Sequence, residues 1–387
     1  MAECELIRAG MANLFPTEFT QSACIRVARA LSVLWATSLV RRCLVFACSC
    51  TRLRVSSAPT GKLGIVNYGA AHDVIKRSST PFADADSEFA QHRVCLEAHK
   101  ETISCIAFPR SVKGSGAGGA DPTASSVFTS SYDGSIRALD IDRAMFSDVA
   151  VRAEDDEYLV HSIRFIDSCT LWYSTSDGDI RLADVRLSAA DNSKLPVHIV
   201  HRKKVGCVDV KDATTLLTAS NDATIALWDS RYMKKTPSAI DTFSSSCTMQ
   251  CAYFSPSGDT IVAQNARDTN FLFFEGSTST FASAGFNASA ALRLPHNNNT
   301  GRFTSTFRSV WDPKYDRVFC IGSMDQPRGF DVFGADYSFS KPASLTFRTK
   351  VAGPLVTNVP ASLAPHPSLP VLFGGNSSGR VTLFVSP

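Results

Sequence analysis

The sequence predicts an all-β protein built from repeated units, a β-propeller of about seven blades. Short apolar runs recur in groups, at the roughly 40-residue period of one propeller blade. Tight Asp-Gly or Asn-Asp turns join the runs, and these residues tolerate the positive φ of two-residue hairpins. No amphipathic helix of any length is evident, which excludes folds with crossover helices.

The composition is that of a folded protein with a large core. The chain has 387 residues, is 44% hydrophobic and carries a net charge of +3. Because this charge is small, a nucleic-acid partner would need a local basic surface. Twelve cysteines include no Cys-x-x-Cys pair, and many lie in apolar runs. We therefore expect thiols in a reducing compartment, cytosolic or nuclear.

The N-terminal segment has more than one interpretation. Residues 1–29 are either a leader, disordered or resembling an Arg-rich transit peptide, or they supply the outer strand of the closing blade. Three strand-like runs follow at 30–35, 43–48 and 62–68. We therefore place the propeller at 30–387. No apolar run reaches the roughly 18–20 residues of a membrane helix.

The remaining units repeat this pattern of strand, turn, strand, tight turn, strand. They span residues 102–140, 158–184, 205–229, 249–274, 296–333 and 361–385. The Gly-rich stretch 113–122 interrupts the first of these. It has neither the Gly-Lys-Ser/Thr nor the following helix of a phosphate loop, so we interpret it as a flexible hairpin loop.

The Trp228-Asp229 ending identifies the WD40 class of propeller. In the same unit, His201, Thr218 and Asp222 stand at the positions of a buried hydrogen-bond relay to the Trp228 side chain. We therefore interpret His201 and Asp222 as structural residues, not a catalytic dyad. Elsewhere the relay has decayed: Leu139 and Ala183 stand where a Trp is expected.

Several motifs together resemble the DNA-damage-binding WD-repeat family, which includes the small subunit of the ultraviolet-damaged-DNA-binding complex. The match runs from about residue 29 to the end, and is closer to the larger nuclear branch of the family. The motifs are SSYDGSIR at 130–137, HRKKV at 201–205, HNNNTGR at 296–302, FRSVWDP at 307–313, GSMDQPR at 322–328 and GGNSSGR at 374–380. The resemblance implies a seven-bladed nuclear propeller with one face on DNA.

Two groups of residues are the candidates for DNA contact. Lys203 and Lys204 lie at the start of a predicted strand, where their side chains can contact phosphates. The resemblance places Lys204 and Arg29 at positions that contact the DNA backbone. The loop 296–304 falls where the family carries a lesion-probing hairpin. Its candidate contact residues are Asn299, Arg302 and Phe303.

The loop departs from the damage-binding subunit in two ways. Gly301 replaces a large tip residue, and the Asn triplet makes the arm polar. We therefore expect less wedging and more hydrogen bonding than in that subunit. The alternatives are a long surface connection for the loop and a solvated charge run for the lysines.

A second face is suggested by the tetrapeptide Trp228-Asp229-Ser-Arg231. The resemblance makes this the signature by which WD-repeat receptors dock on the adaptor of cullin-RING ubiquitin ligases. Arg231 would be the exposed anchor, able to pair bidentately with a partner carboxylate. The segment Asp184-Val-Arg186 is a degenerate second copy. The alternative is a purely structural Trp-Asp ending.

No enzyme motif is evident. Paired carboxylates, a nucleophile elbow and metal-ligand spacings are absent from the sequence, so we expect no catalytic residue, metal, cofactor or small-molecule substrate. The leading hypothesis is a nuclear DNA- or chromatin-binding propeller in the DNA-damage response. The alternative is a protein-interaction scaffold or ligase substrate receptor whose DNA association is indirect.

Overall fold

The computed structural model describes the strands at 22–26, 30–35, 43–49 and 61–67, and then residues 93–385. The second part has breaks at 110–125, 142, 276–279, 302–305, 339–340, 354–355, 357, 368–370 and 377–379. Within the described residues, no helix is both long enough and apolar enough to cross a membrane.

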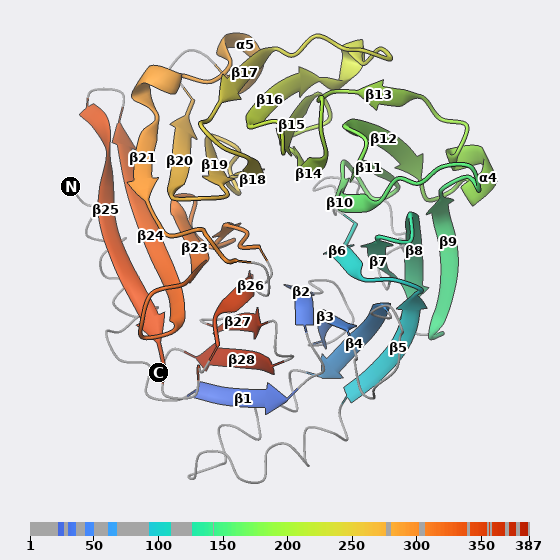
Figure 1. The fold of residues 1–387 in the computed structure, drawn as a ribbon, viewed down its shortest axis with the longest axis horizontal. Helices are drawn as coiled ribbons and strands as arrows, with labels where there is room; N and C mark the ends of the chain where they lie inside the picture. The colour runs from blue at the N-terminus through green and yellow to red at the C-terminus, as the bar shows by residue number, and fades with distance from the viewer. Residues whose placement is uncertain are drawn as a thin grey trace, which may run out of the picture.

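The described strands form seven four-stranded antiparallel sheets arranged as blades around an axis (Figure 1). Blade 1 holds β2 (Ala30–Trp35), β3 (Cys43–Ser49), β4 (Gly61–Asn67) and β5 (Arg93–His99). Blade 2 holds β6 (Ile103–Ala107), β7 (Ser126–Ser131), β8 (Ser135–Asp140) and β9 (Met145–Val151). Blade 3 holds β10 (Val160–Phe165), β11 (Thr170–Thr175), β12 (Asp179–Asp184) and β13 (Val197–Ile199).

The other four blades complete the ring. Blade 4 holds β14 (Val205–Val210), β15 (Thr215–Ser220), β16 (Thr224–Asp229) and β17 (Asp241–Ser244). Blade 5 holds β18 (Met249–Phe254), β19 (Thr260–Asn265), β20 (Thr269–Phe274) and β21 (Leu292–Pro295). Blade 6 holds β22 (Val310–Trp311), β23 (Val318–Ser323), β24 (Gly329–Ser338) and β25 (Lys341–Ala352). Blade 7 holds β26 (Pro360–Pro365), β27 (Val371–Asn376), β28 (Arg380–Val385) and, outermost, β1 (Ser22–Arg26).

The predicted fold class is confirmed, and the three early apolar runs are the strands β2, β3 and β4. The helices described are one turn long: α4 (Ala189–Asn192), α5 (Phe281–Ala284), η1 (Ser230–Tyr232) and η2 (Ala288–Ala290). In blade 7, β1 pairs antiparallel with β28, with Ser22 opposite Phe384. The first described strand therefore completes the sheet that ends the chain.

The core lies between neighbouring blades. One cluster joins Leu217 and Ile225 of blade 4 to Ile261 and Phe273 of blade 5, and all four side chains are fully buried. Similar clusters join blades 2 and 3 and blades 5 and 6. Strands of this kind are apolar on both faces, because a blade packs against a neighbour on each side.

The direction and the pairing of the strands distinguish the two ends of the propeller. Val205 begins β14 and pairs with Ser220, whereas Thr215, at the far end of the sheet, pairs with Asp229. We call the end that holds Ser220 and every link from one blade to the next the connection end. Asp229 therefore lies at the opposite end. In Figure 1 the links after β13 and β21 run inward from the outer strands toward the axis.

A β-bulge marks the connection end of six inner strands. The register shifts within the first few residues of β2, β6, β10, β14, β18 and β26. In β14 the shift lies between Val205 and Cys207, directly after Lys204. A bulge bends a strand and re-aims nearby side chains. These bulges shape the rim around the axis.

Two glycines with positive φ provide a test of the turn geometry. Gly178 has φ +88°, and a Cβ there would lie 2.4 Å from the His201 carbonyl oxygen; Gly301 has φ +67° but open space around it. Gly301→Ala should cost only the left-handed penalty of about 1–2 kcal/mol, whereas Gly178→Ala must also move backbone. Urea denaturation should show the larger loss for Gly178→Ala. Equal midpoints would contradict the close approach of the His201 carbonyl group to Gly178.

Candidate functional site

The relay predicted in blade 4 is continuous in the structure. His201 Nε2 lies 2.7 Å from Thr218 Oγ1, and His201 Nδ1 lies 3.2 Å from Asp222 Oδ2. Trp228 Nε1 donates to the same Thr218 oxygen at 2.8 Å. Thr224 Oγ1 completes the group, 3.0 Å from His201 Nδ1. A single buried hydroxyl therefore joins the imidazole on the connecting loop to the indole on β16.

Electrostatics favour a fixed, neutral imidazole in this relay. Burial lowers the pKa of His201, and the Asp222 carboxylate offsets this only in part. Burial alone would raise the pKa of Asp222, but the hydrogen bonds that its carboxylate accepts from Thr224 and from the Arg202 backbone hold it below its usual value. The carboxylate also accepts from the backbone of Arg202 and Thr224. Its acceptor capacity is used in holding the loop, which fits a structural role.

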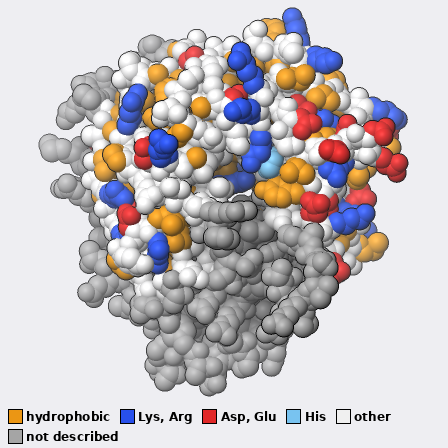
Figure 2. All heavy atoms as spheres, in the orientation of Figure 1, with side chains coloured by type: hydrophobic (Ala, Val, Ile, Leu, Met, Phe, Trp, Pro, Cys, Tyr) orange, Lys and Arg blue, Asp and Glu red, His pale blue; other side chains and the backbone are white. Residues whose placement is uncertain are grey.

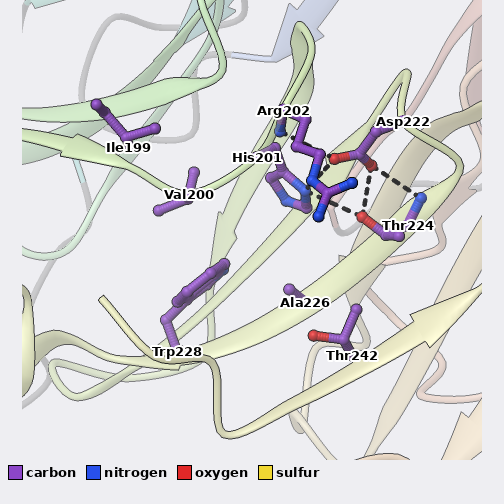
Figure 3. A pocket seen from close by; sticks show the side chains of 9 residues that line it. All are labelled: Ile199, Val200, His201, Arg202, Asp222, Thr224, Ala226, Trp228 and Thr242. Carbon is purple, nitrogen blue, oxygen red and sulfur yellow. Dashed lines mark hydrogen bonds and ion pairs between the residues drawn. The ribbon is translucent and has the colours of Figure 1, made fainter. Parts of the chain in front are cut away.

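A shallow groove of about 450 Å³ opens beside the relay, between the outer parts of blades 3 and 4. Figure 3 shows His201, Asp222 and Thr224 turned toward one another at one side of it. Ile199, Trp228 and Thr242 line the remainder. The imidazole of His201, the carboxylate of Asp222 and the hydroxyl of Thr224 are already paired with one another, which fits their structural role.

A second relay was missed by the sequence analysis. His99 Nε2 lies 2.8 Å from Thr129 Oγ1, and His99 Nδ1 lies 3.2 Å from Asp133 Oδ2. This is the arrangement of blade 4 without its indole, since Leu139 occupies the Trp position. The expectation that the relay has decayed elsewhere is therefore wrong for blade 2. The spacing from Thr129 to Asp133 was the available signal, because Thr218 and Asp222 are the same four residues apart.

The two candidate DNA-binding lysines lie at the connection end. Lys203 is exposed and Lys204 is half-buried, directly before β14. Neither ammonium group forms an ion pair with a described carboxylate. Of their neighbours in the HRKKV motif, Arg202 is exposed, but His201 is 7% exposed and belongs to the relay. His201 therefore does not contribute to the basic surface.

The described part of the probing loop has a fixed base and an exposed tip. His296 Nδ1 lies 2.6 Å from Asn298 Oδ1, and Asn298 is fully buried against Thr269 and Asn270 of blade 5. Asn299 and Gly301 are exposed. The Asn triplet is therefore divided: Asn298 anchors the loop, whereas Asn299 faces solvent at the connection end.

Other predicted positions lie outside the described residues. These are Arg29, Arg302, Phe303 and the Gly-rich stretch 113–122.

The predicted docking residues lie at the opposite end. Trp228 is 4% exposed and serves the relay, whereas the Arg231 side chain is 64% exposed. Arg231 is already engaged by its own carboxylate: Nε and Nη2 donate to Asp229 at 2.9 and 2.6 Å. The bidentate fork expected with a partner's carboxylate is thus formed within the chain.

The degenerate copy in blade 3 has the same geometry. Arg186 Nε and Nη2 donate to Asp184 at 2.9 and 2.5 Å, and its side chain is 69% exposed. An exposed apolar residue follows each arginine, Leu187 in one blade and Tyr232 in the next. The sequence analysis did not single out these two residues. Arginine and tyrosine are enriched at protein interfaces, so the paired forks have the composition of a contact surface.

No set of three or more His, Cys, Asp or Glu side chains suited to a metal ion occurs in the described ranges. Six cysteines whose side chains are described are free thiols: Cys105, Cys169, Cys207, Cys247, Cys251 and Cys320.

Comparisons with known proteins agree with this geometry. A WD domain, G-beta repeat model matches residues 193–229, which contain the blade 4 relay. WD repeat-containing protein 76 of Xenopus laevis is 28% identical over 298 residues, 75% of this chain and 46% of the relative. DNA damage-binding protein CMR1 of Chaetomium globosum is 29% identical over 282 residues, 68% of this chain and 51% of the relative. The CMR1 protein of Phaeosphaeria nodorum is 27% identical over 343 residues, 84% and 60% of the two chains.

These matches and the seven four-stranded sheets define the chain as a WD-repeat propeller. Within that class it is similar to proteins named WD repeat-containing protein 76 and DNA damage-binding protein CMR1, in agreement with the resemblance of its motifs. The chain spans about half the length of the curated relatives it matches. None of the matches indicates an enzyme family.

The two relays provide a matched pair of variants. Thr218→Val removes the partner of both His201 and Trp228, whereas Thr129→Val removes the partner of His99 alone. Each buried group left without a partner costs roughly 1–3 kcal/mol, so Thr218→Val should be the more destabilising by about that amount. Urea denaturation measures both. Equal losses would show that the indole contributes nothing through the relay.

Proposed function

We propose that this chain is a non-catalytic nuclear DNA- or chromatin-binding protein that acts in the DNA-damage response. The observation that carries the proposal is the connection end, where Lys203 and Lys204 stand without carboxylate partners among the described residues and where Asn299 and Gly301 are exposed. Unpaired lysines bind phosphates by releasing counterions, and exposed amides add hydrogen bonds. Relatives named DNA damage-binding protein support the assignment.

The charge distribution favours contact over blades 4 to 6. Arg202, Lys203 and Arg267 are exposed on this part of the connection end. In Figure 2, Asp and Glu side chains gather on the right, over the region that Figure 1 gives to blades 2 and 3. The run Glu154–Glu157 on the link between these blades is exposed. A DNA backbone would therefore approach the lysines and avoid the acidic side.

A protein-docking role for the opposite end is a second candidate. Two neighbouring blades present the same exposed Asp–Arg fork, each followed by an exposed apolar side chain. Repetition of this surface in adjacent blades favours a contact with one partner that covers both. We propose the adaptor of a cullin-RING ligase as that partner. If the connection end does not bind duplex DNA, the association of this chain with DNA would be indirect, through that partner.

Charge removal at the connection end tests the leading function. Lys203→Gln with Lys204→Gln should weaken duplex binding whatever the DNA sequence, and should lower the slope of log affinity against log salt by about one per lysine. Fluorescence anisotropy across a salt series measures this. Arg186→Gln, which removes a positive charge from the opposite end, is the control and should leave the slope unchanged. Lack of any duplex affinity at low salt would refute direct DNA binding.

Removal of both forks tests the second candidate. Arg186→Ala with Arg231→Ala should abolish co-purification of the ligase adaptor, because the exposed guanidinium groups supply the polar contacts of this surface. Binding to duplex DNA by the same variant should persist and shows that the propeller is intact. Adaptor retention by the double variant would place docking elsewhere.

A further inference from the structure

Three nitrogen-bearing side chains meet beside the axis at the connection end. Lys204 precedes β14 of blade 4, His161 lies at the start of β10 of blade 3, and Arg308 lies on the link before β22 of blade 6. We call these three residues the axial cluster. In Figure 2, Lys and Arg side chains and one histidine gather beside the centre, over the inner ends of β10 and β14 in Figure 1.

Arg308 is held in place by its neighbours in sequence. Phe307 and Ser309 are both fully buried, and Ser309 donates to Gln264 at 3.2 Å. From this anchored backbone the guanidinium reaches three blades away, where Nη2 lies 3.5 Å from the His161 carbonyl oxygen. A contact of that length is weak, and it uses one of five N–H donors. The other guanidinium N–H groups have no hydrogen-bond partner among the described residues.

Among the described residues, no carboxylate pairs with the cations of the axial cluster. Arg164, lower on β10, donates to Asp209 at 2.6 Å and is neutralised. Lys204 and Arg308, in contrast, form no ion pair with any described residue. Burial, and then the charge of Arg308, lower the pKa of Lys204. Both side chains are half-buried, and both charges act on His161, so the two cations share one partly solvent-exposed neighbourhood.

His161 adds an unpaired polar atom. Its side chain is 5% exposed, and Nε2 is buried without a hydrogen-bond partner in the described structure. Burial, and then the charges of Lys204 and Arg308, lower the pKa of His161 to about 3. The ring is therefore neutral at pH 7 and can present Nε2–H as a donor. A buried polar atom without a partner normally signals a missing ligand or water.

The charge balance selects the class of ligand. Two cations and a neutral donor match a group that carries nearly two negative charges, which is the charge of a phosphate monoester at pH 7. A carboxylate or an internal phosphodiester carries one charge and would leave one cation uncompensated. An internal diester is also flanked by sugars on both sides, whereas a terminal phosphate has a free side to enter between the inner strands.

We propose that Lys204, Arg308 and His161 form a phosphate-monoester site, and that its occupant is the 5′-terminal phosphate of a DNA strand lying on the connection end. This inference rests on the proposed function, because Lys203 and the Asn299–Gly301 tip would hold the strand beside the site. The propeller would thus distinguish a DNA end from continuous duplex.

The test compares two duplexes that differ at one group. Each carries the same single-stranded 5′ overhang, ending in a phosphate in one and a hydroxyl in the other, and anisotropy gives both affinities. The phosphorylated end should bind about tenfold more tightly, the usual effect of hydrogen bonds to a charged group. Arg308→Gln and, separately, Lys204→Gln should bring the ratio close to one. Lys203→Gln is the matched control: it should weaken both duplexes equally and keep the ratio.

Competitors identify the source of the phosphate. Inorganic phosphate, titrated into the phosphorylated duplex complex, should reduce the affinity to that of the hydroxyl duplex. Equal binding of the two ends by the native chain would overturn the 5′-phosphate site while leaving DNA binding intact. Lack of binding to both would refute the proposed function as well. The two duplexes could also bind equally while a phosphoserine peptide binds the native chain and loses affinity in Arg308→Gln. That result would assign the site to a phosphorylated protein and overturn the proposal of a DNA end. Circular dichroism verifies the fold of each variant, and Lys204→Gln suffices if Arg308→Gln does not fold.

Discussion

The packing of each blade against its neighbours is the constraint on which the structure depends. A four-stranded sheet of this size cannot bury both faces alone, and the clusters around Phe273 and Phe165 show that the apolar side chains of one blade are covered by the next. Exposed loop residues at the two ends, such as Asn299 and Arg231, take no part in this core. Those loops can therefore vary, as the Asn-rich link and the paired forks do, without changing the architecture.

Features governed by short-range pattern were predictable from the sequence. The spacing of the apolar runs, the tight turns and the Trp-Asp ending are all visible within one repeat. The fold class, the strands and the blade 4 relay could therefore be predicted directly. The missed features need contacts across the fold. His161 and Arg308 are 147 residues apart and meet because blades 3 and 6 face one axis. His99 was overlooked because the interpretation depended on a Trp, while its hydroxyl partner Thr129 keeps the relay without one.

The sequence predicted where the residues of the candidate site lie in the fold better than it predicted what each residue does there. Lys203 and Lys204 stand at a strand entry, where the sequence analysis placed them. The Asn triplet shows the limit of sequence-based prediction. Its three residues are identical in type, but Asn298 is buried whereas Asn297 and Asn299 are exposed. Asn298 is buried since its amide bonds the β20 strand, a contact no local pattern encodes. The same sequence thus supplies both the support of the loop and its tip.

The Asp–Arg forks determine what kind of atom a docking partner must offer. Each fork is internally neutral, and Arg231 has committed its Nε–H and one Nη2–H to Asp229. The Arg231 side chain is 64% exposed and belongs to a neutral pair, which suits an uncharged carbonyl oxygen better than a carboxylate. Attachment at that end would then depend little on ionic strength, whereas the unpaired lysines of the other end are screened by added salt. Under the proposed function, a rise in salt would release DNA from the lysines and leave a protein bound at the forks.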